Sequence, residues 1–284
     1  MVTIFTPAYN RAYILPKLYQ SLCNQTSNEF EWLIVDDGSS DNTQLLIQSY
    51  IDEDKINIRY IKQTNGGKHR AINTGLKEAK GDLFFIVDSD DYITDFAVDW
   101  ILKTSMVIMQ DESFAGLSGT RIYANGHRIG GDDNFGTIDA NAIEIRTKHF
   151  VTGDLAEVFK TKILRRFPFP EFDNEKFCPE ALVWNRIAKE YRLRYVNCGI
   201  YICEYLSDGL TANIVKQRRN SPRASMTFYS EQYHSNVPIS IKLRSAINFH
   251  RFSPSLWSKG YHMSNILSIL MFLPGKLMRL ADGR

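Results

Sequence analysis

The chain has 284 residues, enough to bury a substantial core as one large domain or as two fused halves. Its composition, 44% hydrophobic and 23% charged with no tandem repeat, excludes a fibrous or low-complexity protein. The net charge of +2 is uneven, because residues 214–284 carry +9 and residues 1–213 therefore carry −7. A nucleic-acid-binding protein usually carries basic charge on its recognition fold, so we expect no nucleic acid as a partner. The basic last segment instead suits an anionic surface.

The first half of the chain alternates between predicted strands and helices. Apolar runs predict strands at 2–6, 30–35, 56–61 and 83–87. The segments between them predict helices at 13–23, from about 41 to 50, and at 68–80. Continuous apolar strands separated by helices indicate a parallel sheet covered on both faces. The predicted fold class is therefore α/β.

Polar clusters follow three of these strands, at 36–41, 65–70 and 88–91. In an open α/β sheet, ligands bind beyond the carboxyl ends of the strands. We therefore expect three clusters that are distant in the sequence to meet along one edge of the sheet.

The second half of the chain has a more mixed pattern. Strands are expected at 114–123 and 194–205, with an amphipathic helix at 179–191. Beyond Leu210 the pattern becomes helical, basic and aromatic, with a helix from 239 to 252. An apolar stretch at 266–273 is bounded by Pro274-Gly275, and it is far too short to cross a bilayer.

The four cysteines form no Cys-x-x-Cys pair, so we expect reduced thiols in the core rather than a metal or disulfide framework. They are Cys23, Cys178, Cys198 and Cys203. Residues 2–6 lead straight into a strand with no basic region before them, which predicts a cytoplasmic protein without a secretory signal.

Four motifs occur in order at the predicted strand ends. They are Thr-Pro-Ala-Tyr-Asn-Arg (6–11), Val-Asp-Asp-Gly-Ser-Ser-Asp-Asn-Thr (35–43), Asn-Gly-Gly-Lys-His-Arg-Ala-Ile-Asn-Thr-Gly (65–75) and Asp-Ser-Asp-Asp (88–91). This series resembles the successive motifs of family 2 glycosyltransferases, most closely over about the first 110 residues. The resemblance implies the A-type glycosyltransferase fold, in which a mostly parallel central sheet has helices on both faces, followed here by a helical C-terminal extension.

The resemblance also implies a division of the chain. We expect a nucleotide-sugar-binding half at 1–110 and an acceptor-binding half of the same catalytic domain at 111–213. Residues 214–284 are then the basic, helical extension.

The carboxylates at 88–91 predict a metal site. Several negative charges at the end of a buried strand are costly unless a cation neutralises them. Mn²⁺ or Mg²⁺ commonly uses one or two protein carboxylates and completes its shell with phosphates and water. We expect Asp90 to bind the metal directly and Asp88 to face the ribose or the metal. The alternative is an acidic turn that caps the following helix.

Other residues are expected to contact the donor. Asp36 and Asp37 can accept hydrogen bonds from a ribose hydroxyl or a base N–H. By resemblance, Asp37 and Thr6 would face the base, which favours a uridine nucleotide. Asp36 and Asp37 could instead form a turn, and Arg11 could bind the donor or cap the sheet edge.

The turn at 65–67 leads into a predicted helix. Its glycines allow a close backbone approach, and the positive helix end together with Lys68 or Arg70 suits a phosphate. The alternative is an ordinary helix N-terminus with a surface lysine.

The catalytic base is expected in the acceptor half. An inverting transfer needs a carboxylate that takes the proton from the acceptor hydroxyl. Many family members place a Glu-Asp pair at the start of this helix, whereas this chain has Pro-Glu-Ala at 179–181. Glu180 is the closest match, with a helix-stabilising role as its alternative. Asp154 is the rival base.

The predicted activity is therefore an inverting transfer of one sugar from a nucleoside-diphosphate sugar, UDP-linked, to a hydroxyl of a glycan or lipid-linked acceptor in cell-surface polysaccharide synthesis. Processive synthases carry Gln-x-x-Arg-Trp after the base helix, and here no Trp follows Gln217-Arg218-Arg219. The alternative is a sugar-nucleotide-binding protein or a nucleotidyltransferase without glycosyl transfer. No glycine-rich loop follows the first strand, which argues against a nucleotidyltransferase and a dinucleotide-binding fold.

The segment 239–284 mixes apolar and basic residues. Trp257, Lys259 and Tyr261 are residue types suited to lipid headgroups. We expect either peripheral contact with the anionic inner face of the cell membrane, or packing on the catalytic domain or in a homo-oligomer.

Overall fold

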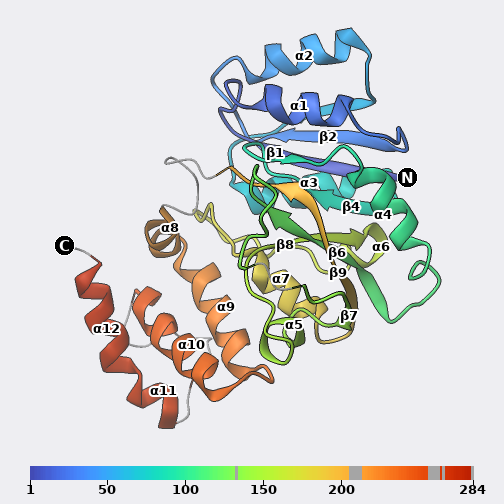
Figure 1. The fold of residues 1–284 in the computed structure, drawn as a ribbon. Coiled ribbons are helices and arrows are strands. Elements are labelled where there is room, and N and C mark those ends of the chain that lie inside the picture. Colours follow the sequence, from blue (N-terminus) through green and yellow to red (C-terminus); the bar gives the residue numbers. More distant parts are fainter. Residues whose placement is uncertain (132–133, 205–212, 255–262, 264–265, 283–284) are drawn as a thin grey trace. The chain divides into compact units, whose positions relative to one another are not determined.

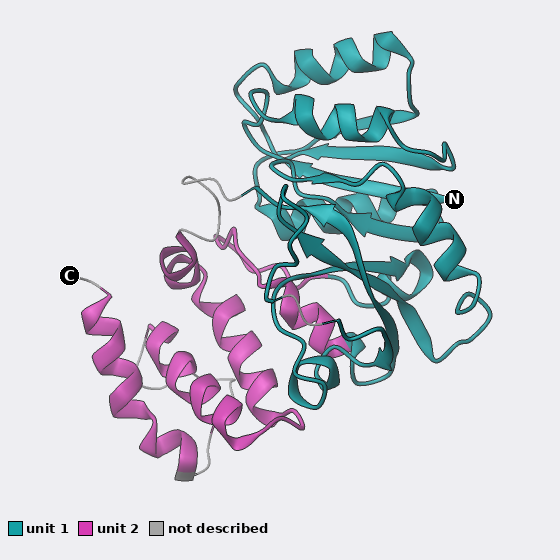
Figure 2. Ribbon diagram, in the orientation of Figure 1, with its two compact units in different colours: residues 1–168, 187–206 teal, residues 169–186, 207–284 magenta. Residues whose placement is uncertain are grey.

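The computed structural model describes residues 1–131, 134–204, 213–254, 263 and 266–282 (Figure 1). The chain divides into two compact units (Figure 2). Unit 1 comprises Met1–Pro168 and Ile187–Leu206, and unit 2 comprises Phe169–Arg186 and Ser207–Arg284. Residues 169–186, which the sequence pattern placed with the acceptor half, thus group with the C-terminal helices.

Unit 1 is built on one mixed sheet of nine strands within the described residues (Figure 1). The strand order is β3-β2-β1-β4-β8-β6-β9-β5, and β7 pairs with β9. The strands are β1 (Val2–Ala8), β2 (Phe30–Asp36), β3 (Ile58–Lys62), β4 (Leu83–Ile86), β5 (Tyr92–Ile93), β6 (Phe114–Ile122), β7 (Thr137–Ala140), β8 (Leu155–Lys160) and β9 (Arg192–Ile202).

The first four strands form the predicted parallel part of the sheet. β1 lies between β2 and β4, with Val2 opposite both Phe30 and Leu83, and β3 lies outside β2. Every residue of β2 is buried, as a parallel strand covered on both faces requires. Because the strands are parallel, their carboxyl ends lie at the same edge.

The second half of the sheet is largely antiparallel. β8 runs antiparallel to both β4 and β6, and the sequence pattern did not predict this strand. Its last residue, Lys160, is fully buried, and its Nζ donates to the carbonyls of Ile108 (2.7 Å), Asp111 (2.8 Å) and Met109 (3.3 Å). A lysine that satisfies backbone carbonyls in the interior is hidden from a hydropathy pattern.

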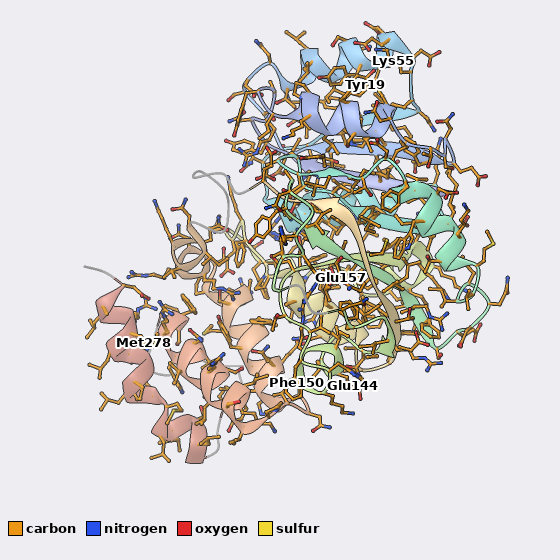
Figure 3. All side chains as sticks on the ribbon, in the orientation of Figure 1. Tyr19, Lys55, Glu144, Phe150, Glu157 and Met278 are labelled. Carbon is orange, nitrogen blue, oxygen red and sulfur yellow. The ribbon has the colours of Figure 1, made fainter. Side chains whose placement is uncertain are left out.

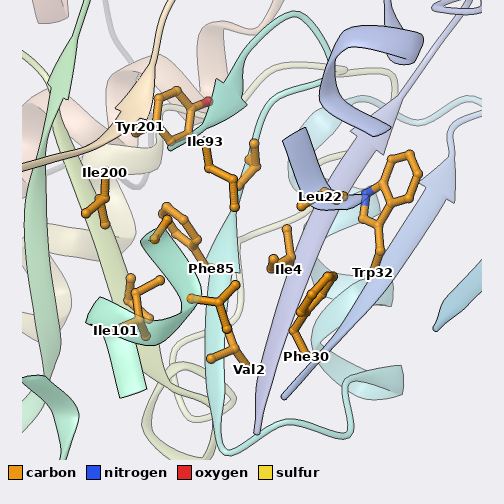
Figure 4. Close-up of a cluster of buried hydrophobic side chains, with 14 of the residues drawn as sticks. Val2, Ile4, Leu22, Phe30, Trp32, Phe85, Ile93, Ile101, Ile200 and Tyr201 are labelled. Atoms are coloured by element: carbon orange, nitrogen blue, oxygen red, sulfur yellow. The ribbon is translucent and has the colours of Figure 1, made fainter. Parts of the chain in front are cut away.

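Helices cover both faces of the parallel strands. Tyr19 of α1 (Leu15–Cys23) stacks on Trp32 of β2 and on Tyr50 of α2 (Thr43–Glu53). With α4 (Ala97–Ser105) these helices share the core cluster drawn in Figure 4. On the other face, Gly75 of α3 (Lys68–Glu78) lies so close to Phe5 that a Cβ would be 2.2 Å from its Cε2. Helices on both faces confirm the predicted α/β fold.

Two short helices complete unit 1. They are α5 (Glu144–Thr147) and α6 (Thr161–Leu164).

All four cysteines of the chain are free thiols, as expected from their spacing.

Unit 2 is helical in its described residues. Its helices are α7 (Glu180–Ile187), α8 (Ile214–Asn220), α9 (Pro222–His234), α10 (Ile239–Phe252), α11 (Ile266–Leu270) and α12 (Phe272–Ala281). A small core of Met226, Tyr233, Ala246, Phe249 and Met263 joins α9 to α10. None of the helices in the described ranges is long and apolar enough to span a bilayer.

Helix α12 continues through Pro274-Gly275, the two residues that bound the apolar stretch in the sequence. Pro274 lies in the first turn of the helix, where backbone N–H groups have no partner within the helix and a proline costs little. Gly275 is buried against α10, and a Cβ there would lie 2.5 Å from the carbonyl oxygen of Ile247. The glycine therefore allows two helices to approach closely.

We expect Gly116→Ala to destabilise unit 1. A Cβ on Gly116 of β6 would lie 2.0 Å from the carbonyl oxygen of Val158 of β8, so the strand pair has to separate. Overpacking of this kind costs about 1–3 kcal/mol, which a urea titration of the unfolding free energy will detect. Thr137→Ala on the exposed surface of β7 is the control. An unchanged midpoint for Gly116→Ala would show that β6 and β8 are not paired as described.

Candidate functional site

The carboxylate of Asp37 joins two of the polar clusters. Its Oδ1 accepts hydrogen bonds from Gln63 Nε2 (2.7 Å) and the Gly66 N–H (2.9 Å). Its Oδ2 accepts from the Gly67 N–H (2.7 Å) and Asn65 Nδ2 (3.1 Å). The end of β2 is thereby tied to the turn that leads from β3 into α3.

Asp36, the last residue of β2, stabilises the turn that follows this strand. It is fully buried, and its two carboxylate oxygens accept hydrogen bonds from the Ser39 N–H (2.7 Å) and the Tyr60 hydroxyl (2.5 Å). These contacts fix the turn after β2.

The third cluster meets the other two through an ion pair. Gly67 adopts a φ of +96°, a backbone conformation that favours glycine, and α3 begins at the next residue. Lys68 then places its Nζ 2.5 Å from Asp88 Oδ1 at the end of β4. The three strand-end clusters therefore come together at one edge of the sheet, as the strand order predicted.

The acidic turn at 88–91 is held by a tyrosine from β9. The Tyr201 hydroxyl accepts a hydrogen bond from the Asp88 N–H (3.0 Å) and donates one to Asp91 Oδ2 (2.8 Å). The N–H of Glu204 donates to Asp91 Oδ1 (3.1 Å). Arg121 of β6 lies over the Tyr201 ring, 4.2 Å from its centre, and 3.9 Å from Asp91.

The three aspartates experience different electrostatic surroundings. Burial opposes the ionisation of Asp88, but the charges of Lys68 and Arg121 outweigh it and hold the pKa of Asp88 below its usual value. Burial and the negative charge of Asp88 raise the pKa of Asp90. The same two causes raise the pKa of Asp91 to about 6. Negative charge at this turn is thus only partly compensated by the protein.

This turn fits a divalent cation that takes few protein ligands. The described residues contain no group of three or more His, Cys, Asp or Glu side chains arranged to hold a metal. Asp88 and Asp90 supply two carboxylates, and burial together with the negative charge of Asp88 raises the pKa of Asp90. Mg²⁺ or Mn²⁺ held by one or two carboxylates, with phosphates and water completing its shell, matches that donor set.

The remaining predicted donor residues lie around the same edge. The Thr6 hydroxyl is fully buried and accepts a hydrogen bond from the Trp32 indole N–H (3.0 Å), so it is part of the core. Arg11 directs positive charge at Asp88 and Asp90. Its backbone N–H donates to Thr43 Oγ1 (3.0 Å), which fixes the loop after β1.

Arg70 packs across the glycine turn at the start of α3. A Cβ on Gly66 would lie 2.5 Å from Arg70 Cδ, so only a glycine lets the arginine take this position. The basic end of α3 thus carries both Lys68 and Arg70 beside the turn.

The two candidate bases lie in different units. Asp154 of unit 1 is exposed, in the loop that leads into β8. Glu180 of unit 2 is half-buried and is the first residue of α7. Glu175, in the loop before α7, is buried and accepts hydrogen bonds from the Arg223 and Ala224 N–H groups (2.8 and 2.9 Å). Its role is therefore to cap α9.

Sequence reasoning missed Arg121 and Tyr201. The available signal for Arg121 was a charged residue near the end of an apolar predicted strand, where a buried charge needs a partner. Tyr201 gave no such signal, because a tyrosine in a strand is common. The pairing of β9 with β5, which places Tyr201 opposite Ile93, brings its hydroxyl to the acidic turn.

A polar site at the carboxyl ends of parallel strands is typical of a nucleotide-binding α/β enzyme. The sequence model of the family described as "Glycosyl transferase family 2" matches residues 3–167. That match spans more than half of the chain, and the protein therefore belongs to glycosyl transferase family 2.

Two relatives act on lipid-linked acceptors by name. The chain is 26% identical over 198 residues to the GalNAc(5)-diNAcBac-PP-undecaprenol beta-1,3-glucosyltransferase of Campylobacter jejuni, a match covering 66% of this chain and 60% of that enzyme. It is 27% identical over 216 residues to the UDP-Glc:alpha-D-GlcNAc-diphosphoundecaprenol beta-1,3-glucosyltransferase WfgD of Escherichia coli, covering 72% and 76%. The chain thus spans less than two thirds of the Campylobacter enzyme.

Solved structures confirm the predicted A-type glycosyltransferase fold. The structure of S. aureus TarS 1–349 in complex with UDP-GlcNAc matches with a TM-score of 0.66 and 19% identity, covering 96% of this chain and 79% of that chain. The mannosyltransferase PcManGT of Pyrobaculum calidifontis in complex with GDP-Man and Mn²⁺ has a TM-score of 0.59 with 16% identity, covering 100% and 76%. At these identities the likeness shows the fold alone.

We expect Tyr201→Phe to weaken donor binding. The variant keeps the ring but removes the hydroxyl that joins the Asp88 N–H to Asp91. Loss of a buried hydrogen bond to a charged group predicts a fall of about tenfold in kcat/KM for the donor, together with a weaker Kd measured by calorimetry. Tyr195→Phe is the matched control, because Tyr195 is a second buried tyrosine of β9. Equal donor affinity in both variants would contradict a positioning role for Tyr201.

The contribution of Asp91 to the stability of the metal-free protein should fall as the pH rises from about 4 to about 6. The pKa of Asp91 is raised from 3.8 to about 6, so the folded state retains a proton that the unfolded chain releases. The stabilisation is present below pH 4 and is lost as the pH passes 6, a change of about 3 kcal/mol. Urea titrations in a chelator should show that Asp91→Asn lacks this loss, whereas Asp82→Asn on the surface retains it. A parallel pH profile for Asp91→Asn would contradict the assignment.

Proposed function

We propose that this protein is an inverting glycosyltransferase that transfers a single sugar from a nucleoside-diphosphate sugar, UDP-linked, to a hydroxyl of a glycan or lipid-linked acceptor in cell-surface polysaccharide synthesis. The observation that carries the proposal is the meeting of three strand-end clusters, joined by Asp37 and by the Lys68–Asp88 ion pair. The names of the two bacterial relatives support a β-glycosidic product on a diphosphate-linked lipid.

The donor's diphosphate is assigned to the basic and acidic groups at this edge. Asp90 and Asp88 would hold Mn²⁺ or Mg²⁺, which when bound offsets the charge on the departing nucleoside diphosphate. Mn²⁺ in the PcManGT complex supports this choice of metal. Lys68, Arg70 and Arg11 carry positive charge toward the same edge, where a diphosphate would be bound and oriented.

The nucleoside is assigned to the turn after β2. Asp36 and Asp37 stand at the end of that strand, and their carboxylates set the backbone of the turns on which a base or ribose would rest. Thr6 would contribute to nucleoside binding indirectly, because its hydroxyl accepts the hydrogen bond from Trp32 that supports the end of β1. UDP and UDP-GlcNAc in the titles of the TarS complexes support a uridine nucleotide.

The proton of the acceptor hydroxyl is assigned to Glu180, with Asp154 as the rival base. Glu180 is half-buried at the start of α7, and the positive end of a helix attracts negative charge. A carboxylate at this position would accept the proton as the acceptor oxygen attacks the sugar. Asp154 has the same chemistry in an exposed loop.

A lipid-linked acceptor implies work at a membrane surface. We assign a cytoplasmic location with peripheral contact to the inner leaflet through residues 239–284, rather than a homo-oligomer contact. The net charge of +9 in residues 214–284 supports attraction to an anionic leaflet. Trp257, Lys259 and Tyr261, which the sequence pattern assigned to the headgroup level, lie outside the described residues.

A donor panel with Mn²⁺ tests the function. The nucleoside diphosphate released from each sugar nucleotide should be highest for a UDP-sugar, and a chelator should remove the release. Asp90→Ala should abolish metal-dependent donor binding, whereas Asp82→Ala, at the opposite end of β4, should retain it. No release from any donor, combined with no thermal shift on adding nucleotides, would refute the proposal.

The same assay with an acceptor separates the two bases. Glu180→Gln should retain donor affinity and lose turnover by a factor of about 100 or more, because general-base catalysis contributes about 10²–10⁴. Asp154→Asn should retain turnover. The reverse result would assign the base to Asp154.

A further inference from the structure

Helix α12 exposes a row of leucines. Leu273, Leu277 and Leu280 are 64%, 57% and 69% exposed. Their spacing of four and three residues places them on one face of the helix. Ile269 and Leu270, at the end of α11, are exposed as well. Large apolar side chains that gather on a surface in this way mark an interaction site.

The opposite face of α12 is fixed to α10. Gly275 is buried so closely against α10 that a Cβ would lie 2.5 Å from the Ile247 carbonyl oxygen. Near the end of α12, Asp282 forms a two-pronged ion pair with Arg251 of α10, at 2.6 and 2.7 Å. Because this face is fixed by close packing and by an ion pair, the leucines are held outward.

Basic side chains on α12 also bind toward α10. Lys276 Nζ and Arg279 Nη1 donate to the Ser253 carbonyl at 3.0 and 2.8 Å. Met278, labelled in Figure 3, is a further exposed apolar side chain of this helix. The helix thus turns hydrogen-bonding groups inward and apolar groups outward, the reverse of an ordinary surface helix.

We propose that the leucine face, residues 269, 270, 273, 277 and 280, docks on an anionic lipid bilayer. An interfacial helix of this kind lies in the membrane plane with its apolar face buried about 5–10 Å deep. The inference rests on the proposed function in one respect, because a lipid-linked acceptor places the substrate at a bilayer. It adds the surface by which the protein docks there.

Charge selects the bilayer over a second copy of the chain. Residues 214–284 contain eleven Lys or Arg and only two acidic residues, Glu231 and Asp282. Both acidic residues are engaged within unit 2, Glu231 with Arg186 (2.6 Å) and Asp282 with Arg251. Two such segments facing each other would repel, whereas an anionic leaflet attracts them.

Vesicle sedimentation with the full chain tests the proposal. The vesicles contain equal parts of phosphatidylglycerol and phosphatidylcholine, or phosphatidylcholine alone. Wild type should bind the anionic vesicles and bind the neutral ones far less. The triple variant Leu273→Gln/Leu277→Gln/Leu280→Gln should bind anionic vesicles about tenfold less, because it loses the apolar insertion.

A matched control uses three apolar residues that are equally exposed elsewhere. Leu45, Met106 and Val107 of unit 1 are 70%, 70% and 66% exposed. Their replacement by Gln should leave vesicle binding unchanged. Circular dichroism and the thermal midpoint should stay at wild-type values in both triple variants, since the replaced side chains lie on the surface.

The outcomes separate this inference from the proposed function. Release of UDP from the soluble donor needs no vesicle, so it should be equal in wild type and in both triple variants. If UDP is released but the leucine variant binds vesicles like wild type, docking through the leucine face is refuted. If no donor is hydrolysed but the leucine variant still loses vesicle binding, the proposed function fails and the docking surface stands. A wild-type dimer that the leucine variant converts to a monomer, with no vesicle binding by either, assigns the face to a second copy and overturns the proposal.

Discussion

The charge of the acidic turn after β4 is the constraint around which the site of unit 1 is arranged. Asp88, Asp90 and Asp91 repel one another where water is largely excluded, so each needs compensation from elsewhere. Positive charge comes from α3, from β6 and from the loop after β1, and hydrogen bonds come from β9. The compensation is incomplete, as the raised pKa values of Asp90 and Asp91 show. A divalent cation would complete it, so the turn is better suited to the metal-bound state than to the free one.

The sequence predicted the parts of the molecule whose structure is set locally. Strands β1 to β4 are nearly continuous apolar runs separated by amphipathic helices, and that pattern implies parallel pairing and a shared carboxyl edge. The meeting of Asp37 with the 65–67 turn follows from this topology, although its four hydrogen bonds do not. Helix α10 was predicted at 239–252 because the pattern that indicates it, a mixture of apolar and basic residues, lies within the helix itself.

What the sequence did not predict depends on contacts between distant residues. β8 is a short strand with two charged residues, and its place in the sheet is fixed by β4 and β6 on either side. Its Lys160 is buried because three carbonyls after α4 surround its Nζ. Tyr201 reaches the acidic turn across 113 residues of sequence. Such contacts are set by the pairing of strands, which periodicity along one strand does not reveal.

Helix α12 shows that a Pro-Gly pair does not always end a helix. Pro274-Gly275 has the composition of a helix end, yet the proline stands in the first turn and the glycine is the point of contact with α10. Close approach there lets Lys276 and Arg279 reach the Ser253 carbonyl just beyond the end of α10. Polar groups satisfied on the inner side leave the leucines outside, where only an apolar or lipid partner lowers their free energy. The glycine that lets α12 approach α10 therefore also determines which face the helix presents.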